Sequence, residues 1–132
     1  MLTVIALSFP GRVSDGILWY RPLSNYEKLA VWAGNNTVEN SIFVVPPDMS
    51  GFRFWSQRSV VNESKEGGEG LFDRNFSISW DQREDMLEAY ETLTPAEVTS
   101  LKSTFHATYL VTQNTLAYPE LKSYGNWHLY SI

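Results

Sequence analysis

The stretch SIFVVPPDMSGFRFWSQRSVV, residues 41–61, decides the fold class of this chain. It opens with a short β-branched apolar run, residues 41–45, which is typical of a buried strand in a parallel sheet. Pro46 and Pro47 end that strand, because proline has no amide hydrogen to donate to a neighbouring strand. Residues 58–61 predict a second strand after the aromatic connection. The stretch therefore predicts two strands joined by a compact connection.

A helix is predicted directly before this stretch. Ser24 and Glu27 form a capping box, in which the serine side chain accepts from the Glu27 amide and Glu27 reaches back to the Ser24 amide. We expect this helix to cover residues 25–33. Gly34 then suits the left-handed C′ position that follows many helices. The apolar face is made by residues at helical spacing, namely Leu29, Trp32 and Ala33.

Two more helices are predicted after the stretch. Ser79 or Asp81 caps the first of them, which runs to about Tyr90. The second has a stronger start signal, because Thr94 is an N-cap, a proline follows at the first helical position, and Glu97 completes a capping box. Helices that lie between apolar strands predict the crossover connections of an α/β protein.

The last part of the chain predicts two more strands. Residues 107–112 form one apolar run, and residues 127–132 alternate between the two faces of a strand. The link between them is rich in turn residues, which favours a broad hairpin. The sequence thus predicts an α/β fold with a small, mainly parallel sheet flanked by helices, in a two- or three-layer sandwich, and a C-terminal antiparallel hairpin.

Length and composition set the domain organisation and exclude several function classes. The 132 residues fit one domain, which we expect to cover residues 24–132. Residues 1–23 are expected to form either a first strand or packed segment, or the stub of a transmembrane helix, since their apolar run is shorter than the ~20 residues of a full span. The net charge of −5, without a basic run, argues against a nucleic-acid partner. The chain has no cysteine, which excludes thiolate catalysis and cysteine-ligated metals.

The connection between the first two strands carries the candidate binding residues. It leaves the carboxyl end of a predicted parallel strand, where open α/β sheets bind ligands. Asp48 is a candidate general base, metal ligand or substrate contact, Arg53 and Arg58 suit a phosphate or carboxylate, and Trp55 suits a sugar ring or an apolar chain. The alternative is structural: Asp48 forms a turn, the aromatic side chains belong to the core, and Arg58 pairs with a carboxylate.

No motif in the chain predicts a catalytic centre. His106 and His128 are the only histidines, and neither belongs to a metal-binding spacing. A nucleophile elbow of the GxSxG type is missing as well. We therefore predict no catalytic residue, no metal and no cofactor in this chain. Three N-x-S/T sequons, at Asn35, Asn62 and Asn75, matter only in a glycosylating compartment.

Several segments together resemble a known group of membrane proteins. The stretch VWAGNNTVENSIFVVPPDMSGFRFWSQRSVV, residues 31–61, the later pair Trp80 and Arg83, and the closing strand–loop–strand resemble the C-terminal part of polytopic membrane proteins related to GT-C-type glycosyltransferases. The resemblance also matches Lys65 to a lysine that often follows this stretch, and it thereby adds Lys65 to the candidate substrate-binding residues. The glycine-rich segment after Lys65 departs from the pattern.

The resemblance implies a non-catalytic, extracytoplasmic accessory domain that follows a bundle of transmembrane helices. It implies a membrane partner, through those upstream segments, and a glycan or lipid-linked sugar as ligand. Two alternatives stay open: a stand-alone carbohydrate- or anion-binding module that uses Arg53, Trp55 and Arg58, and a small α/β hydrolase or transferase that uses Asp48 and a histidine.

Overall fold

The computed structural model describes residues 21–63 and 74–132. The predicted N-terminal segment, residues 1–23, lies almost wholly outside the described residues, as does Lys65. In chain order the described elements are α3 (Asn25–Asn36), β1 (Ile42–Val44), α4 (Phe52–Ser56), β2 (Ser59–Val60), α5 (Arg74–Leu87), the 3₁₀ turn η3 (Tyr90–Thr92), α6 (Pro95–Phe105), β3 (Tyr109–Thr112), β4 (Glu120–Tyr124) and β5 (Trp127–Ser131).

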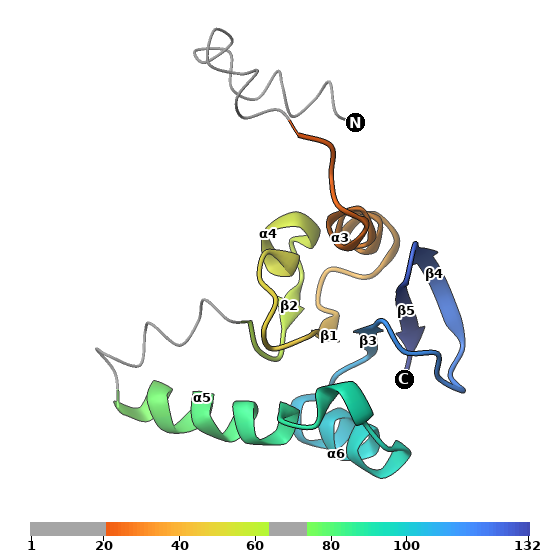
Figure 1. The fold of residues 1–132 in the computed structure, drawn as a ribbon. Coiled ribbons are helices and arrows are strands. Elements are labelled where there is room, and N and C mark those ends of the chain that lie inside the picture. Colours follow the sequence, from red (N-terminus) through yellow and green to blue (C-terminus); the bar gives the residue numbers. More distant parts are fainter. Residues whose placement is uncertain (1–20, 64–73) are drawn as a thin grey trace, which may run out of the picture.

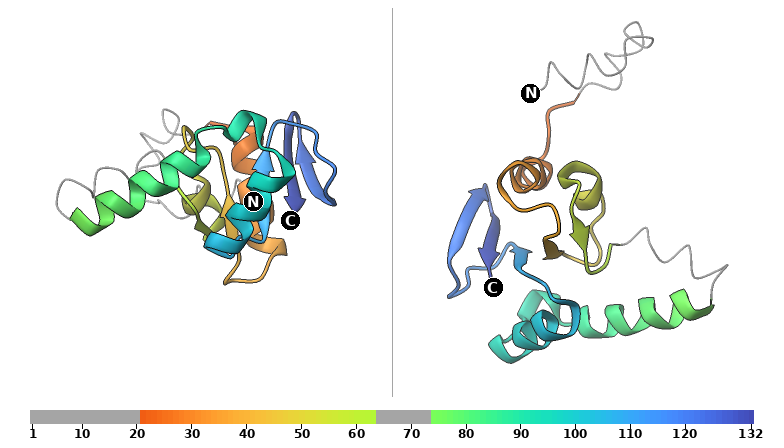
Figure 2. Two further views of the ribbon diagram at one scale, coloured as in Figure 1. Left: turned by 90° about the horizontal axis from the view of Figure 1, so that it is seen from below. Right: turned by 180° about the vertical axis from the view of Figure 1, so that it is seen from behind.

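These elements form a mixed α/β structure with a five-stranded sheet flanked by helices, which confirms the predicted class. The strand order is β2-β1-β3-β5-β4. Figure 1 shows α3 and α4 on one side of the sheet and α5 and α6 on the other. The right view of Figure 2, seen from behind, shows the same layering, with α5 extending past β2.

The sheet is more antiparallel than predicted. β1 pairs in parallel with β2 and with β3, but each of these ladders aligns only two residue pairs. β5 pairs antiparallel with β3 and with β4, and each of these ladders aligns four. The prediction of a mainly parallel sheet missed β4, because this edge strand is mostly exposed and lacks an apolar run that would mark it in the sequence.

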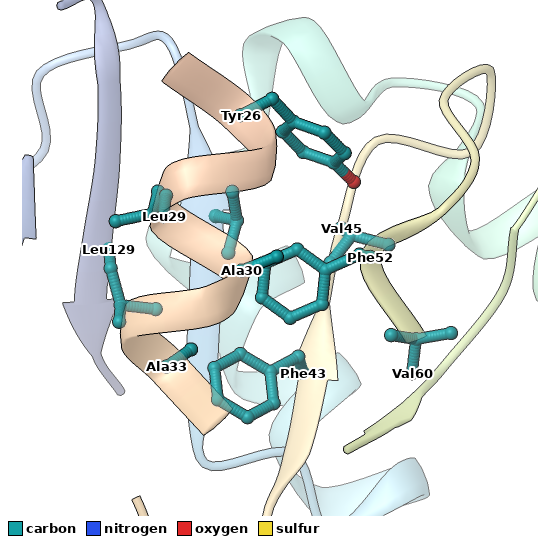
Figure 3. Close-up of a cluster of buried hydrophobic side chains, with 10 residues drawn as sticks. Tyr26, Leu29, Ala30, Ala33, Phe43, Val45, Phe52, Val60 and Leu129 are labelled. Carbon is teal, nitrogen blue, oxygen red and sulfur yellow. The ribbon is translucent and has the colours of Figure 1, made fainter. Parts of the chain in front are cut away.

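One face of the sheet packs against α3 and α4 (Figure 3). Phe43 on β1 stacks on Tyr109 and contacts Phe52 of α4, with ring centroids 4.9 and 5.1 Å apart. Alternate strand residues point to this side because successive side chains of a strand face opposite ways. The buried members of this cluster are Tyr26, Leu29, Ala30, Ala33, Phe43, Val45, Phe52, Val60, Val111 and Leu129.

The other face packs against the end of α5, η3 and α6. Val44 and Leu110 point to this side of the sheet and are fully buried. Each directly follows a residue, Phe43 or Tyr109, that points toward α3. Leu87 of α5, Tyr90 of η3 and Leu101 of α6 cover them. The central strands β1 and β3 are therefore buried on both faces, as their continuous apolar runs predict.

The two predicted capping boxes are both present. The Ser24 hydroxyl accepts from the Glu27 amide at 3.2 Å, and the Thr94 hydroxyl accepts from the Glu97 amide at 3.3 Å. The α5 start was predicted wrongly: the helix begins at Arg74 rather than after Ser79 or Asp81, and it ends at Leu87.

Gly34 has a different role from the predicted one. α3 continues through it to Asn36, so Gly34 does not end the helix. A Cβ atom at this position would lie 2.3 Å from the carbonyl oxygen of Ser56 in α4. Glycine is required here because the two helix backbones approach each other closely.

Across the described residues, we find no helix that is both long and apolar enough to cross a membrane.

Candidate functional site

The carboxyl edge of the parallel strands is the natural place for a site in this topology. From the end of β1 the chain turns through α4 to β2 on one side, whereas from the end of β3 it leaves toward β4 on the other side. Strand ends whose connections diverge in this way leave a crevice, and open α/β sheets bind ligands there.

A cleft opens between the start of α3 and the chain around α4, and it takes in residues that follow β1 and β2 but none that follows β3. We call it the α3–α4 cleft; its volume is about 1080 Å³. It is lined by residues from the α3 start, from the α3–β1 turn, from the β1–α4 loop, from α4 itself and from β2 and its flanking residues. They are Arg21, Ser24, Tyr26, Glu27, Glu39, Met49, Ser50, Gly51, Arg53, Phe54, Trp55, Gln57, Arg58, Ser59 and Glu63.

The short helix α4 presents the aromatic wall of the cleft. It begins after Gly51, whose φ of 94° is left-handed and therefore favours glycine, and it ends at Gln57, with a φ of 56°. The buried carboxylate of Glu63 accepts from the Arg53 amide at 2.8 Å. This bond satisfies one of the amides that the first turn of a helix leaves unpaired, and it places a negative charge at the positive end of the helix.

The aromatic residues of α4 divide between the core and the cleft. Phe52 is fully buried, which agrees with the alternative prediction that the aromatic side chains belong to the core. Phe54 is 68% exposed and Trp55 is half-buried, and their rings meet edge to face at 5.1 Å. Because both line the cleft, an accessible aromatic surface forms one of its walls.

The Arg58 guanidinium is engaged by the C-terminal end of α3. It donates to the carbonyl oxygens of Gly34 and Thr37, both at 2.7 Å, and to the Thr37 hydroxyl at 3.2 Å. A cation at this end of a helix is stabilised by the helix dipole as well as by the hydrogen bonds. Arg58 therefore pairs with backbone carbonyls, and not with the carboxylate that the structural alternative proposed.

A charged pair closes the other end of the cleft. Arg21 donates to both carboxylate oxygens of Glu27, at 2.6 and 3.0 Å. Burial alone would raise the pKa of Glu27, but the hydrogen bonds from Arg21 and Ser24, together with the Arg21 charge, lower it below its usual value. Glu27 is thus held ionised by partners from the chain itself.

Tyr26 lies deeper in the same cleft. Its residue is only 3% exposed, and its hydroxyl is buried without a hydrogen-bond partner. Burial raises its pKa well above the usual range, and the negative charges of Glu63 and Asp48 raise it further. The Tyr26 hydroxyl is consequently neutral and unpaired, and it feels the negative charges of Glu63 and Asp48.

Two more unpaired polar atoms belong to residues next to the strand ends. Asn62, directly after β2, is fully buried; its amide donates to Glu84 while its carbonyl oxygen has no partner. Tyr90 is buried on the opposite face of the sheet from Tyr26, and its hydroxyl has no well-aligned hydrogen bond, although the Thr112 side chain interacts with it. Burial, and next the nearby Tyr26, raise the pKa of Tyr90, while the interaction with Thr112 lowers it.

The candidate residues of the sequence are only partly brought together. Arg53, Trp55 and Arg58 all line the α3–α4 cleft. Asp48 is exposed on the β1–α4 loop and is not among the lining residues, although its charge acts on Tyr26. Lys65 lies outside the described residues.

The histidines do not meet Asp48. His106 follows α6 and precedes β3, so it lies where the parallel strands begin. Asp48 follows β1 and lies where these strands end. His128 on β5 contacts Glu120 on β4. Within residues 21–63 and 74–132, no group of three or more histidine, aspartate or glutamate side chains is arranged to hold a metal ion. The geometry therefore gives no support to the hydrolase alternative.

Sequence reasoning missed the deeper residues of the cleft. Tyr26 reads as one of several aromatic residues on a helix, and Glu63 stands in a charged segment. Their shared location depends on packing α3 against α4. The one available signal was the position of Glu63 directly after a predicted strand, where ligand-contacting residues often lie.

Comparisons with known proteins give one partial match. No curated protein and no solved structure matches the chain. Residues 24–87 match a family model described as "Domain of unknown function (DUF6798)". The matched segment runs from α3 through α5 and contains all the residues that line the α3–α4 cleft except Arg21.

Proposed function

We propose that this chain is a non-catalytic, extracytoplasmic accessory domain of a membrane-embedded, glycosyltransferase-like protein, and that the α3–α4 cleft binds a sugar of its acceptor or substrate. The observation that carries the binding role is the half-buried ring of Trp55 on the cleft wall. Pyranose rings present apolar C–H faces that stack on aromatic side chains, while their hydroxyl groups need hydrogen-bonding partners nearby.

The polar lining of the cleft supports this ligand class. Ser24, Ser50 and Gln57 lie around the same cleft as Trp55 and offer both donors and acceptors. A site that combines an aromatic surface with a few polar groups is the usual form of a small-ligand pocket. The accessory role is supported by the resemblance to GT-C-related membrane proteins and by the separation of both histidines from Asp48.

Binding is tested by titrating the chain with neutral pyranosides and following tryptophan fluorescence and amide shifts. Trp55→Ala should weaken binding about tenfold or more, equivalent to ~1.4 kcal/mol. Leu121→Ala is the matched control, because Leu121 is an exposed apolar residue on β4 and does not line the cleft. Equal affinities of the two variants would remove the cleft from sugar binding.

The membrane association is tested separately in the parent gene. The proposal expects transmembrane segments encoded upstream of residue 1, with this domain on the extracytoplasmic side in a topology reporter assay. A reading frame that starts at Met1 without such segments would contradict the accessory role but leave the binding test intact.

A further inference from the structure

The Tyr26 hydroxyl stands out among the buried polar atoms. Four side-chain polar atoms in the described part of the chain are buried without a partner, on Tyr26, Asn62, Trp80 and Tyr90. Of these four residues, only Tyr26 lines the α3–α4 cleft. Leaving a buried hydroxyl unpaired opposes folding, so an unpaired one beside a cleft points to a partner that comes from outside the chain.

The ring of Tyr26 is held too firmly to turn its hydroxyl elsewhere. It packs against Trp127 at 4.7 Å and against Phe52 at 5.8 Å, measured between ring centroids. Figure 3 shows the ring projecting from α3 above Phe52 and Val45, with the hydroxyl at its far end, on the side of the chain that continues β1. The position of the hydroxyl is thus fixed before any ligand arrives.

A flexible side chain packs against the cluster that contains Tyr26. Water does not reach the hydroxyl, although the Tyr26 residue lines the cleft. Met49 lines the cleft, is half-buried and packs against the cluster that contains Tyr26. Methionine has three rotatable bonds and fills gaps adaptably, so a small movement of Met49 is the simplest way for a ligand group to reach the hydroxyl.

The charges of the cleft favour a neutral ligand. The Arg21 guanidinium is paired with Glu27, and that of Arg58 is paired with the carbonyl oxygens of α3. The Arg53 side chain also has a partner, because it donates to the Val60 carbonyl oxygen at 3.4 Å. Since Glu39 and Glu63 lie in the same cleft, an anionic ligand would meet carboxylates and would have to compete for guanidinium groups already in use.

We infer that Tyr26 is the hydrogen-bonding anchor of the α3–α4 cleft and that the cleft selects a neutral, hydroxyl-rich ligand such as a pyranoside over its anionic counterparts. One ligand hydroxyl bonds to Tyr26 beside Glu63, while the sugar ring lies on Trp55. This inference rests on the proposed sugar-binding function. It adds the residue that anchors the sugar and the charge of the sugar that is bound.

The test compares Tyr26→Phe with Tyr90→Phe. Both changes remove one buried tyrosine hydroxyl, but only Tyr26 lines the cleft, so Tyr90→Phe is the control. The full chain is titrated by calorimetry with neutral methyl glucoside and methyl mannoside and with the corresponding uronates. We expect Tyr26→Phe to weaken binding of the neutral sugars about fivefold, the loss of one ordinary hydrogen bond, and Tyr90→Phe to leave it unchanged.

A thermal melt of each variant separates a binding role from a structural one. Because the Tyr26 hydroxyl has no partner within the chain, Tyr26→Phe should melt at or above the wild-type temperature. A lower melting temperature for Tyr26→Phe would show that the hydroxyl is needed by the fold and would overturn the inference.

The remaining outcomes separate this inference from the proposed function. Sugar binding that depends on Trp55 but is unchanged in Tyr26→Phe overturns the anchor and leaves the function standing. Tighter binding of the uronates overturns the neutral class. Binding of no sugar at all overturns the proposed function together with the inference.

Discussion

Arg58 hydrogen-bonds the main-chain carbonyl of Thr37 at 2.7 Å and so joins the residue just before β2 to the end of α3. Its guanidinium reaches Gly34 in the same way. Three separate parts of the matched family segment, the end of α3, α4 and the start of β2, are thereby fixed around the cleft.

Replacing Arg58 should destabilise the fold. Arg58→Ala removes charge-assisted hydrogen bonds to two helix carbonyls and a cation at the C-terminal end of α3, so we expect a loss of about 2–4 kcal/mol in the free energy of unfolding. Urea denaturation measures it. Lys28→Ala, at an exposed position on α3, is the control. Equal losses in the two variants would show that the Arg58 contacts contribute little.

Gly34→Ala should destabilise the protein, although alanine is the better helix former. In an ordinary helix interior this change would stabilise by about 1 kcal/mol. Here the new Cβ would lie 2.3 Å from the Ser56 carbonyl oxygen, so α3 and α4 must move apart at a loss of about 1–3 kcal/mol. Asn35→Ala, at the exposed neighbouring position, provides the comparison. A rise in melting temperature for Gly34→Ala would contradict the close approach of the helices.

Acid should weaken the start of α3. The pKa of Glu27 is lower in the folded chain than its usual value of about 4.3, so its contribution to stability is present above that pH and is lost as the pH falls through the folded value. Glu27→Gln should therefore lower stability by about 1 kcal/mol at pH 7 and by less near pH 3. Denaturant midpoints at the two pH values measure this, with the exposed Glu39→Gln as control. A difference that persists at pH 3 would mean that the Glu27 charge is not responsible.

Alkali should unfold the protein through its buried tyrosines. Burial raises the pKa of Tyr26 and of Tyr90 in the folded chain above the usual value of about 10. The unfolded chain therefore releases these protons first, and stability falls by about 1.4 kcal/mol per pH unit for each tyrosine above pH ~10. The double variant Tyr26→Phe, Tyr90→Phe should lose less stability between pH 9 and 11 in urea denaturation. The same pH dependence in wild type and double variant would exclude these tyrosines as the cause.

Features that depend on neighbouring residues were predictable from the sequence. The capping boxes at Ser24 and Thr94 join residues three positions apart, so their pattern is complete in the sequence and the structure confirms both. The strands around residues 42–44 and 109–112 were likewise marked by continuous apolar runs. Arg53, Trp55 and Arg58 were assigned to one site because they follow a strand end, and all three line the cleft.

Features that depend on distant residues were not predictable. Gly34 reads as a helix end because its contact with Ser56 is invisible in the sequence. From the sequence, Arg58 was interpreted as a ligand contact or as the partner of a carboxylate. Its partners are main-chain carbonyl oxygens, which no sequence pattern marks because every residue has one. Tyr26 was missed because its position in the cleft follows from packing, not from a motif.

The place of β5 in the sheet has a consequence for the order of folding. β5 follows β4 in the chain but lies between β3 and β4, so β4 has hydrogen bonds to the sheet only through β5. Hairpins such as β4–β5 close within microseconds, whereas pairing β1 with β3 must bring together residues more than 60 positions apart. The hairpin is therefore expected to form early, and the carboxyl edge that borders the cleft late. A destabilising change at that edge should speed unfolding more than it slows folding.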